Sequence, residues 1–294
     1  MFVFLLSLKH PETANNYQRV EELLELTLRS ICGQSCAEFR VVVVCNKVPQ
    51  INFSDDRVHF HVVDYPAVSK SGGKLDKEEK FTDKGTKYMS GLLFAKQFAP
   101  KYVYIFDSDD WVNRNLVSYM KSAPDYPLWC VDKGYFVNFE SKEYKKRSGL
   151  LRYCGSTFIY DYNFLMREAN VQGAIDEKSS QKELIEATSH HFIVKLLSNH
   201  TINYVYFKDK GIVAKPIPLR TACWIQGTGE NVSNTAGGYK GLSIDDEFCH
   251  TFSLPDSCKS KDKAEFSNWI RDLFAGIYSS LTWYYSKYTG KRVF

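Results

Sequence analysis

The stretch 101–116, KYVYIFDSDDWVNRNL, places three carboxylates directly after a short apolar run. Residues 102–106 are β-branched and aromatic, which is typical of a buried strand. Asp107, Asp109 and Asp110 then follow within four positions. Carboxylates this close repel one another, and either a raised pKa or a bound cation relieves the repulsion. The stretch therefore predicts a buried strand that ends in an acidic cluster.

The spacing of the acidic residues favours a metal site. Alternate residues of a strand face the same side, so Asp107 and Asp109 are expected to project together while Ser108 points away. Mg²⁺ or Mn²⁺ bound by such carboxylates keeps positions open for phosphate oxygens. The alternative is an acidic turn in which Asp110 caps the next helix. We prefer the metal site because three acidic residues, rather than one, follow the strand.

With these residues in view, the chain resembles the GT-A glycosyltransferases, particularly the family-2 type, whose sheet carries an Asp-x-Asp in a phrase like DSDDWV. The resemblance covers residues 1–205 as an order of elements. It implies an α/β fold, Rossmann-like, with a mostly parallel sheet flanked by helices. It also implies a hexosyltransferase of polysaccharide biosynthesis. Such an enzyme uses Mn²⁺ or Mg²⁺ to move a sugar from a nucleoside-diphosphate sugar of UDP or GDP type to a saccharide or lipid-linked acceptor, with inversion expected.

Composition bounds the size of the fold and the partners. With 294 residues, 44% of them hydrophobic, the chain can bury one large core or one core with an appendage. A net charge of +4 is too small for a protein that binds polyanions, so we expect no nucleic-acid partner. Eight cysteines without a C-x-x-C pair, and an N-terminal apolar run too short for a signal peptide, predict a reduced, cytoplasmic chain.

The first 65 residues predict a β-α-β-β order. Continuous apolar runs at 2–8, 39–45 and 58–63 predict strands, and helical spacing of apolar residues predicts a helix over 15–31. Strands that are apolar on both faces imply a parallel sheet covered by helices. Further along, we expect a mobile, charged loop at 69–87, helices at 84–98, 116–120 and 192–197, strands at 128–131, 152–160 and 202–207, a hairpin through 135–139 and a basic turn at 145–147.

Two regions are expected. Residues 1–210 would form the nucleotide-sugar-binding catalytic domain, including the acceptor side, and residues 211–294 a C-terminal loop and aromatic helical extension packed on it. Within the extension, residues 266–288 space their aromatic side chains as one broad stripe. The stripe predicts a helix packed on the domain, or else an interfacial helix that makes peripheral contact with the inner face of a membrane.

The resemblance assigns roles around the nucleotide. Asp109 would be the direct metal ligand, Asp107 would contact the metal, a metal-bound water or the ribose, and Asp110 would orient a ligand or the donor sugar. Asn46 ends the second strand, where the family often keeps an acidic residue for the base, and Asp64 ends the third. Each of these two residues is otherwise an ordinary polar residue at a strand end.

Lysines and small residues complete the predicted binding surface. Lys84 or Lys87 would reach the donor, since ligands of open α/β sheets lie beyond the carboxyl ends of the strands; the alternative is a solvated linker. Gly155 and Ser156 would floor the acceptor site or form a β-bulge. Trp224, just before the GTGENVS loop, would offer a stacking face for a sugar, or belong to an ordinary surface loop.

A general base is needed for inversion. His190 falls where the family supplies an Asp, at the start of a predicted helix. The adjacent His191 would be a metal ligand or a packing residue. Glu186 and Asp176 are the acidic alternatives, and without any of these a retaining mechanism becomes possible.

Three other readings remain open at this stage. A haloacid-dehalogenase-type phosphohydrolase also starts from a strand and Asp-x-Asp, but it normally has Thr or Val where Trp111 stands. A sugar nucleotidyltransferase would need a glycine-rich, Arg-containing loop after the first strand, where the sequence reads KHPET. An inactive sugar-binding scaffold would share the fold without the chemistry.

Overall fold

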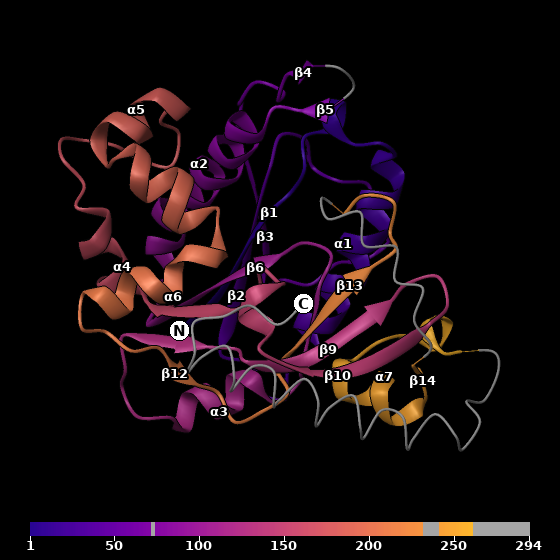
Figure 1. Cartoon of the computed structure of the whole chain (residues 1–294). Helices are drawn as coiled ribbons and strands as arrows, with labels where there is room; N and C mark the ends of the chain where they lie inside the picture. Colours follow the sequence, from indigo (N-terminus) through magenta and orange to yellow (C-terminus); the bar gives the residue numbers. More distant parts are fainter. Residues whose placement is uncertain (72–73, 232–240, 261–294) are drawn as a thin grey trace.

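The computed structural model describes residues 1–71, 74–231 and 241–260. Its main sheet contains seven strands in the order β12-β8-β11-β6-β1-β2-β3 (Figure 1). The four strands at one side, β6, β1, β2 and β3, are parallel, whereas β11 runs antiparallel to β6 and β8. The predicted α/β architecture with a mostly parallel sheet is confirmed. The strands are β1 (Phe2–Ser7), β2 (Phe39–Cys45), β3 (Val58–Val62), β6 (Tyr102–Asp107), β8 (Leu128–Cys130), β11 (Phe158–Asp161) and β12 (Lys215–Pro216).

Helices cover both faces of this sheet. Neighbouring residues of β1 belong to different hydrophobic cores: Phe4 packs with α1 on one face, and Leu5 packs with α2 on the other. This two-sided burial explains why β1 and β2 are apolar at all positions but Ser7 and Arg40. The helices are α1 (Tyr17–Cys32), α2 (Lys77–Ala95), α3 (Leu116–Ser122), α4 (Tyr162–Ala169), α5 (Gln181–Ala187), the π-helical turn η4 (His191–Leu197) and α6 (His200–Asp209).

A second sheet of five strands, in the order β14-β10-β9-β13-β7, encloses a separate core with helix α7. Strand β7 begins directly after the acidic cluster, so the cluster lies where the chain passes from one sheet to the other. Aromatic side chains of the strands pack on Phe248 and Phe252 of α7. The elements are β7 (Trp111–Val112), β9 (Lys133–Asn138), β10 (Glu143–Ser148), β13 (Ala222–Gln226), β14 (Leu242–Ser243) and α7 (Asp246–Phe252).

The chain after residue 210 contributes to both sheets. Strand β12 pairs with β8 of the main sheet, and β13 lies between β9 and β7 of the second. The described part of the predicted extension is therefore built into the body of the protein. The aromatic stripe at 266–288 lies outside the described residues, so its packing or membrane contact stays a prediction.

Four local predictions are wrong. The strand predicted at 152–160 starts only at Phe158, because Gly149, with φ of +75°, leads into a 3₁₀ turn at Leu150–Arg152. Residues 202–207 form part of helix α6 rather than a strand, because Asn199 caps the helix through the Thr201 amide, at 3.2 Å. Helix α2 starts at Lys77, inside the predicted loop, where Asp76 accepts a hydrogen bond from the Glu79 amide at 2.8 Å. The predicted basic turn, 145–147, lies within strand β10, which forms a hairpin with β9.

All eight cysteines are free thiols. Among the helices that the structure describes, none is both long enough and apolar enough to cross a bilayer. Two short strands, β4 (Lys70–Ser71) and β5 (Lys74–Leu75), pair with each other ahead of α2.

Candidate functional site

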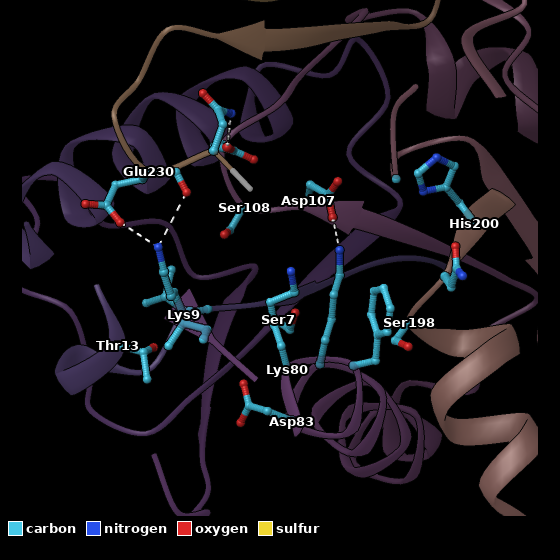
Figure 2. Close-up of a pocket in the computed structure, with 18 of the residues that line it drawn as sticks. Ser7, Lys9, Thr13, Lys80, Asp83, Asp107, Ser108, Ser198, His200 and Glu230 are labelled. Atoms are coloured by element: carbon cyan, nitrogen blue, oxygen red, sulfur yellow. Dashed lines mark hydrogen bonds and ion pairs between the residues drawn. The ribbon is translucent and has the colours of Figure 1, made fainter. Parts of the chain in front are cut away.

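A cavity of about 550 Å³ lies at the carboxyl ends of β1 and β6. These two strands end side by side, with Ser7 opposite Asp107 in the parallel register. Both residues line the cavity, together with residues of α2, of the start of α6 and of the loop after β13 (Figure 2). Open α/β sheets bind their ligands at this edge. Asp107 and Asp109 of the acidic cluster therefore face this cavity.

Lys84 and Asp107 form an ion pair inside the cavity. The Lys84 Nζ to Asp107 Oδ1 distance is 2.6 Å, and the two side chains are 32% and 23% exposed. Burial opposes both charges, but the carboxylate raises the pKa of Lys84 and the ammonium lowers the pKa of Asp107. Lys84 thus lies on the cavity wall, and its predicted contact with a donor stays a prediction.

The negative charge of Asp109 has the fewest stabilising contacts among the three carboxylates, since within the described residues it receives one side-chain hydrogen bond and no ion pair. Burial, and then the nearby charge of Asp107, raise the pKa of Asp109 to about 7. Its Oδ2 accepts a hydrogen bond from Asn231 Nδ2 at 3.2 Å. Strand β6 ends at Asp107, so Ser108 and Asp109 belong to a turn, and Ser108 also lines the cavity instead of pointing away as the strand pattern predicted.

Asp110 lies behind the cavity wall and is fully buried. It accepts hydrogen bonds from Ser156 Oγ at 2.7 Å, from Cys154 Sγ at 3.0 Å and from the Ile225 amide at 3.1 Å. Burial and the neighbouring Asp109 raise its pKa well above the ordinary value. The predicted roles of Asp110 in orienting a ligand and of Ser156 in binding an acceptor do not fit these positions. Asp110 instead binds the acidic turn to β13 through the Ile225 amide, and Ser156 binds it to the segment before β11.

Gly155 occupies a position where only hydrogen fits. A Cβ atom placed on it would lie 2.3 Å from Asp107 Oδ2, far closer than atoms pack. The absence of a side chain lets the backbone lie against the carboxylate, and the Gly155 backbone hydrogen bond helps to lower the pKa of Asp107. Gly155 lines the cavity, and its predicted role in an acceptor site stays a prediction.

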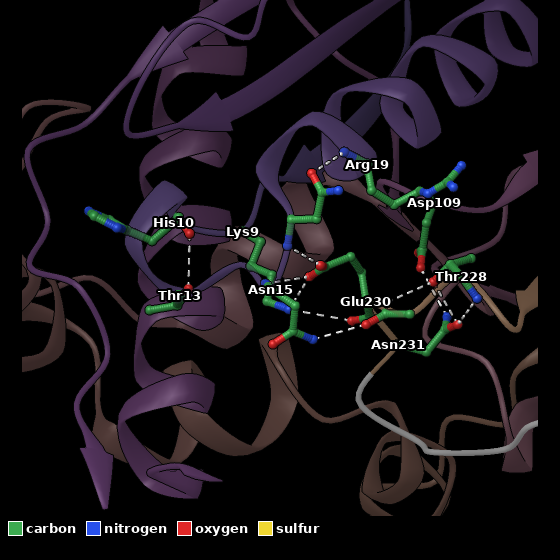
Figure 3. Close-up of polar contacts among 11 residues, drawn as sticks. Lys9, His10, Thr13, Asn15, Arg19, Asp109, Thr228, Glu230 and Asn231 are labelled. Atoms are coloured by element: carbon green, nitrogen blue, oxygen red, sulfur yellow. Dashed lines mark hydrogen bonds and ion pairs between the residues drawn. The ribbon is translucent and has the colours of Figure 1, made fainter. Parts of the chain in front are cut away.

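Glu230 holds the loop after β13 against Lys9 and the start of α1 (Figure 3). The Glu230 carboxylate accepts hydrogen bonds from Lys9 Nζ at 2.7 Å, the Asn15 amide at 3.2 Å and the Asn16 amide at 2.6 Å. Gly227 and Gly229 have φ of +73° and +78°, a conformation that favours glycine. The loop therefore joins the start of α1 to the acidic turn, through Glu230 on one side and Asn231 on the other.

Two aromatic rings, those of Tyr153 and Trp224, also line the cavity. Trp224 and Tyr153 stack with ring centroids 6.1 Å apart, and Phe136 packs edge-on against both rings. Tyr153 is 47% exposed, and both Tyr153 and Trp224 line the cavity. The predicted stacking face of Trp224 is thus available next to the acidic turn, with Tyr153 as a second ring that the sequence did not reveal.

Three predicted nucleotide-binding residues lie elsewhere. Asn46 donates to the backbone carbonyls of Val63 and Tyr65 and is not among the residues that line the cavity. Asp64 is exposed outside the cavity. Lys87 is fully buried and binds Asp83 and the carbonyl of Leu8, so it fixes the end of β1.

The predicted catalytic residues are also outside the cavity. His190 is half exposed and pairs with Glu78 on the surface, and the exposed His191 lies beside the ring of Tyr206. Glu186 and Asp176 are exposed as well. A histidine at the start of a helix does reach the cavity, but it is His200 at the start of α6. This position of His200 was not predictable, because 202–207 has the pattern of a strand.

A divalent cation fits the acidic turn only if a bound molecule supplies further ligand atoms beside the protein carboxylates. Asp107 and Asp109 face one cavity, and the raised pKa of Asp109 reflects negative charge that a cation would neutralise. In the described residues, no group of three or more His, Cys, Asp or Glu side chains could hold a metal. His191 is therefore not placed as a third ligand. Two carboxylates with phosphate and water oxygens are the usual ligands of Mg²⁺.

Comparisons with known proteins give only remote similarity. No family model matches the chain, and no curated protein matches it. Among solved structures, that of S. aureus TarS (residues 1–349) is similar at 13% identity, with a TM-score of 0.34, over 76% of this chain and 60% of that one. The same protein in complex with UDP-GlcNAc is similar at 14% identity, with a TM-score of 0.37, over 82% and 62%. The chain thus spans less than two thirds of the TarS structures.

Proposed function

We propose that the chain is a GT-A-type glycosyltransferase that moves a sugar from a UDP- or GDP-sugar to a saccharide or lipid-linked acceptor, with Mn²⁺ or Mg²⁺ as cofactor. The observation that supports the proposal is the pair Asp107 and Asp109, which face a cavity at the carboxyl ends of parallel strands. The cavity is large enough for a ligand of this size, since small-molecule sites typically have volumes of about 300–1,000 Å³.

The residues of the cavity suit a sugar diphosphate. Asp109, with Asp107, would hold the divalent cation, which when bound stabilises the negative charge on the leaving diphosphate. Lys84 and Lys80 line the cavity and add positive charge toward the phosphates. Apolar side chains of α1 and α2, including Leu23 and Phe81, line the cavity beside these lysines and offer a surface for the base.

The sugar and the acceptor would lie at the other end. The stacked rings of Trp224 and Tyr153 match the apolar face of a pyranose, and Gly155 permits close approach of a sugar to the backbone. Glu230 would hold the loop closed over the bound donor, which excludes bulk water from the reacting carbon.

Calorimetry with UDP and GDP, with and without Mn²⁺, tests the metal-assisted site. We expect Mn²⁺ to strengthen binding of one nucleotide, and Asp109→Ala to abolish the Mn²⁺ effect while the protein stays folded. The matched control is Asp125→Ala, because Asp125 is 81% exposed and pairs with Lys101 away from the cavity. Unchanged Mn²⁺-dependent affinity in Asp109→Ala would refute the metal site.

A panel of UDP- and GDP-sugars with Mn²⁺ tests the reaction class. Slow release of UDP or GDP from one donor is the expected result. Phosphate release from sugar phosphates would instead support a phosphohydrolase, and binding without turnover would support a sugar-binding scaffold.

A further inference from the structure

A narrow chamber of about 10 Å³ is lined by Lys84, whose ammonium pairs with Asp107. Lys84, Gly155, Ser198 and His200 line both this chamber and the main cavity, so the two spaces adjoin. A space of roughly 10–15 Å³ is the size that holds one water molecule. The chamber thus has the size of a single-water site next to the proposed reaction centre.

Two buried acceptor atoms belong to residues that line the chamber. His200 and Asn203 are separated by one turn of α6 and lie on the same face of the helix. His200 Nε2 and Asn203 Oδ1 are both buried and have no hydrogen-bond partner among the described residues. The Asn203 amide nitrogen is used, since it donates to Tyr160 Oη at 2.7 Å. Buried polar atoms rarely stay unpaired, and one water can donate to both acceptors.

The environment of His200 keeps its Nε2 free of a proton. The imidazole is hydrogen-bonded to the backbone of Arg152, and because Nε2 has no partner, this bond uses Nδ1 as the donor. Burial lowers the pKa of His200 to about 4; the charge of Asp107 acts in the opposite direction, and that of Lys84 in the same direction. At neutral pH, His200 is therefore a neutral imidazole with an open lone pair.

We propose that His200 receives the proton of the acceptor hydroxyl during sugar transfer, through one water molecule held in the chamber by His200 and Asn203. This assignment rests on the proposed glycosyltransferase function. A base needs to lie within hydrogen-bond reach of the proton it removes or to act through one water, and the chamber provides the second arrangement.

Sugar transfer by this route conserves bonds, electrons and protons. The acceptor oxygen forms a bond to the anomeric carbon while the bond from that carbon to the diphosphate oxygen breaks, and the electron pair leaves with the nucleoside diphosphate. The acceptor proton passes to the chamber water, which passes one of its own protons to His200 Nε2. The resulting imidazolium lies near the negative charge of Asp107 and releases its proton to solvent after the products leave.

Substitution of His200 tests the role in catalysis. His200→Gln keeps a polar side chain but cannot take up a proton, and His200→Ala removes the ring. The assay measures hydrolysis of the donor that the wild type hydrolyses, with water as the acceptor and Mn²⁺ present. We expect both variants to lower the kcat of this hydrolysis by roughly 10²–10⁴-fold. KM and the affinity for UDP or GDP should change by less than about twofold, and added imidazole should partly restore His200→Ala. His190→Ala, outside the cavity, is the control and should keep the full rate.

A glutamine variant with the wild-type rate would overturn the assignment while leaving the proposed function intact. A wild-type protein that turns over no donor would refute the proposed function and this role together.

The protonation state has its own test that needs no activity. In ¹⁵N-histidine-labelled protein at neutral pH, the ring nitrogens of His200 should report a protonated Nδ1 and an unprotonated Nε2, assigned by their loss in His200→Gln. The opposite tautomer, or a charged ring, would overturn the proposal whatever the rates are. Asn203→Ala removes the second acceptor of the water and should slow hydrolysis, whereas Tyr160→Phe removes only the partner of the amide nitrogen and should slow it less.

Discussion

Lys9 and Glu230 are 221 positions apart in the sequence and form an ion pair of 2.7 Å. Glu230 is almost fully buried, with 6% of its side chain exposed, and it also accepts two backbone amides at the start of α1. The next residue, Asn231, donates to Asp109. The position of the loop that carries Glu230 and Asn231 is therefore coupled to the position of Asp109.

Glu230→Ala should release the loop from Lys9 and from the start of α1. Lys9 and two amides lose a buried charged acceptor, and hydrogen bonds to charged groups contribute about 1.5–3 kcal/mol, so we expect a loss of that order in the free energy of unfolding. Mn²⁺-dependent nucleotide binding should weaken as well. Denaturant unfolding and calorimetry measure the two effects. Glu247→Ala, an exposed glutamate on α7, should change neither, and equal behaviour of the two variants would show that the loop is not held by Glu230.

Asp109 and Asp110 should respond in opposite ways to alanine. Asp110→Ala leaves the hydroxyl of Ser156 and the amide of Ile225 without their buried acceptor, so the unfolding free energy should fall by about 3 kcal/mol or more. Asp109→Ala removes a charge that is repelled by Asp107, so stability without metal should stay level or rise. Urea titrations in EDTA compare the two. A larger loss for Asp109→Ala would contradict the assignment of Asp110 as the structural carboxylate.

Gly155→Ala should disturb the cavity through Asp107. The added Cβ would meet Asp107 Oδ2 at 2.3 Å and force the carboxylate away from its position. We expect Mn²⁺-dependent nucleotide affinity to fall at least tenfold. Gly173→Ala is the control, because its Cβ meets nothing within 4 Å but its φ of +82° costs roughly 1–2 kcal/mol for a side chain. That variant should lose stability yet bind nucleotide normally.

The sequence predicted the parts of this site that depend on local pattern. Asp107 could be located because a run of buried residues marks β6, and the residue after such a run lies at the sheet edge in any open α/β fold. Gly155 and Trp224 were placed by the order of elements. The ion pair of Lys84 was only half predictable, because the helix that carries the lysine begins at Lys77, within a segment whose charges resemble those of a loop.

The parts that depend on tertiary contacts were not predictable. Residues 202–207 are mostly β-branched and aromatic, and packing of Phe207 and Asn203 into the core, together with the cap at Asn199, makes them helical. Because a strand was predicted where α6 lies, His200 was not predicted to lie at the start of a helix. The catalytic role was therefore assigned to His190 and His191. Asp110 illustrates the same limit, since its three hydrogen-bond partners come from distant segments.

The neutral state of His200 should appear in the pH dependence of stability. Its pKa is about 4 in the folded protein and about 6.5 in an unfolded chain, so the unfolded chain binds the proton first as the pH falls. Stability from this residue is complete above about pH 6.5 and is lost progressively toward pH 4, by about 3 kcal/mol. Urea unfolding in EDTA, compared with His200→Gln, isolates this contribution. Parallel pH profiles for the two proteins would contradict the low pKa.

Tyr153 should affect the sugar and not the nucleotide. Its ring is 47% exposed and stacked on Trp224, so Tyr153→Ala removes a stacking surface with little loss of packing. Aromatic stacking contributes about 0.5–1.5 kcal/mol, which corresponds to roughly 2- to 10-fold in affinity. Calorimetry with Mn²⁺ should therefore show weaker binding of the donor UDP- or GDP-sugar and unchanged binding of the free nucleotide. Tyr153→Phe keeps the ring and should bind both as the wild type does. If Tyr153→Ala weakened the free nucleotide equally, the ring would belong to the nucleotide end of the cavity, and the orientation proposed for the donor would be reversed.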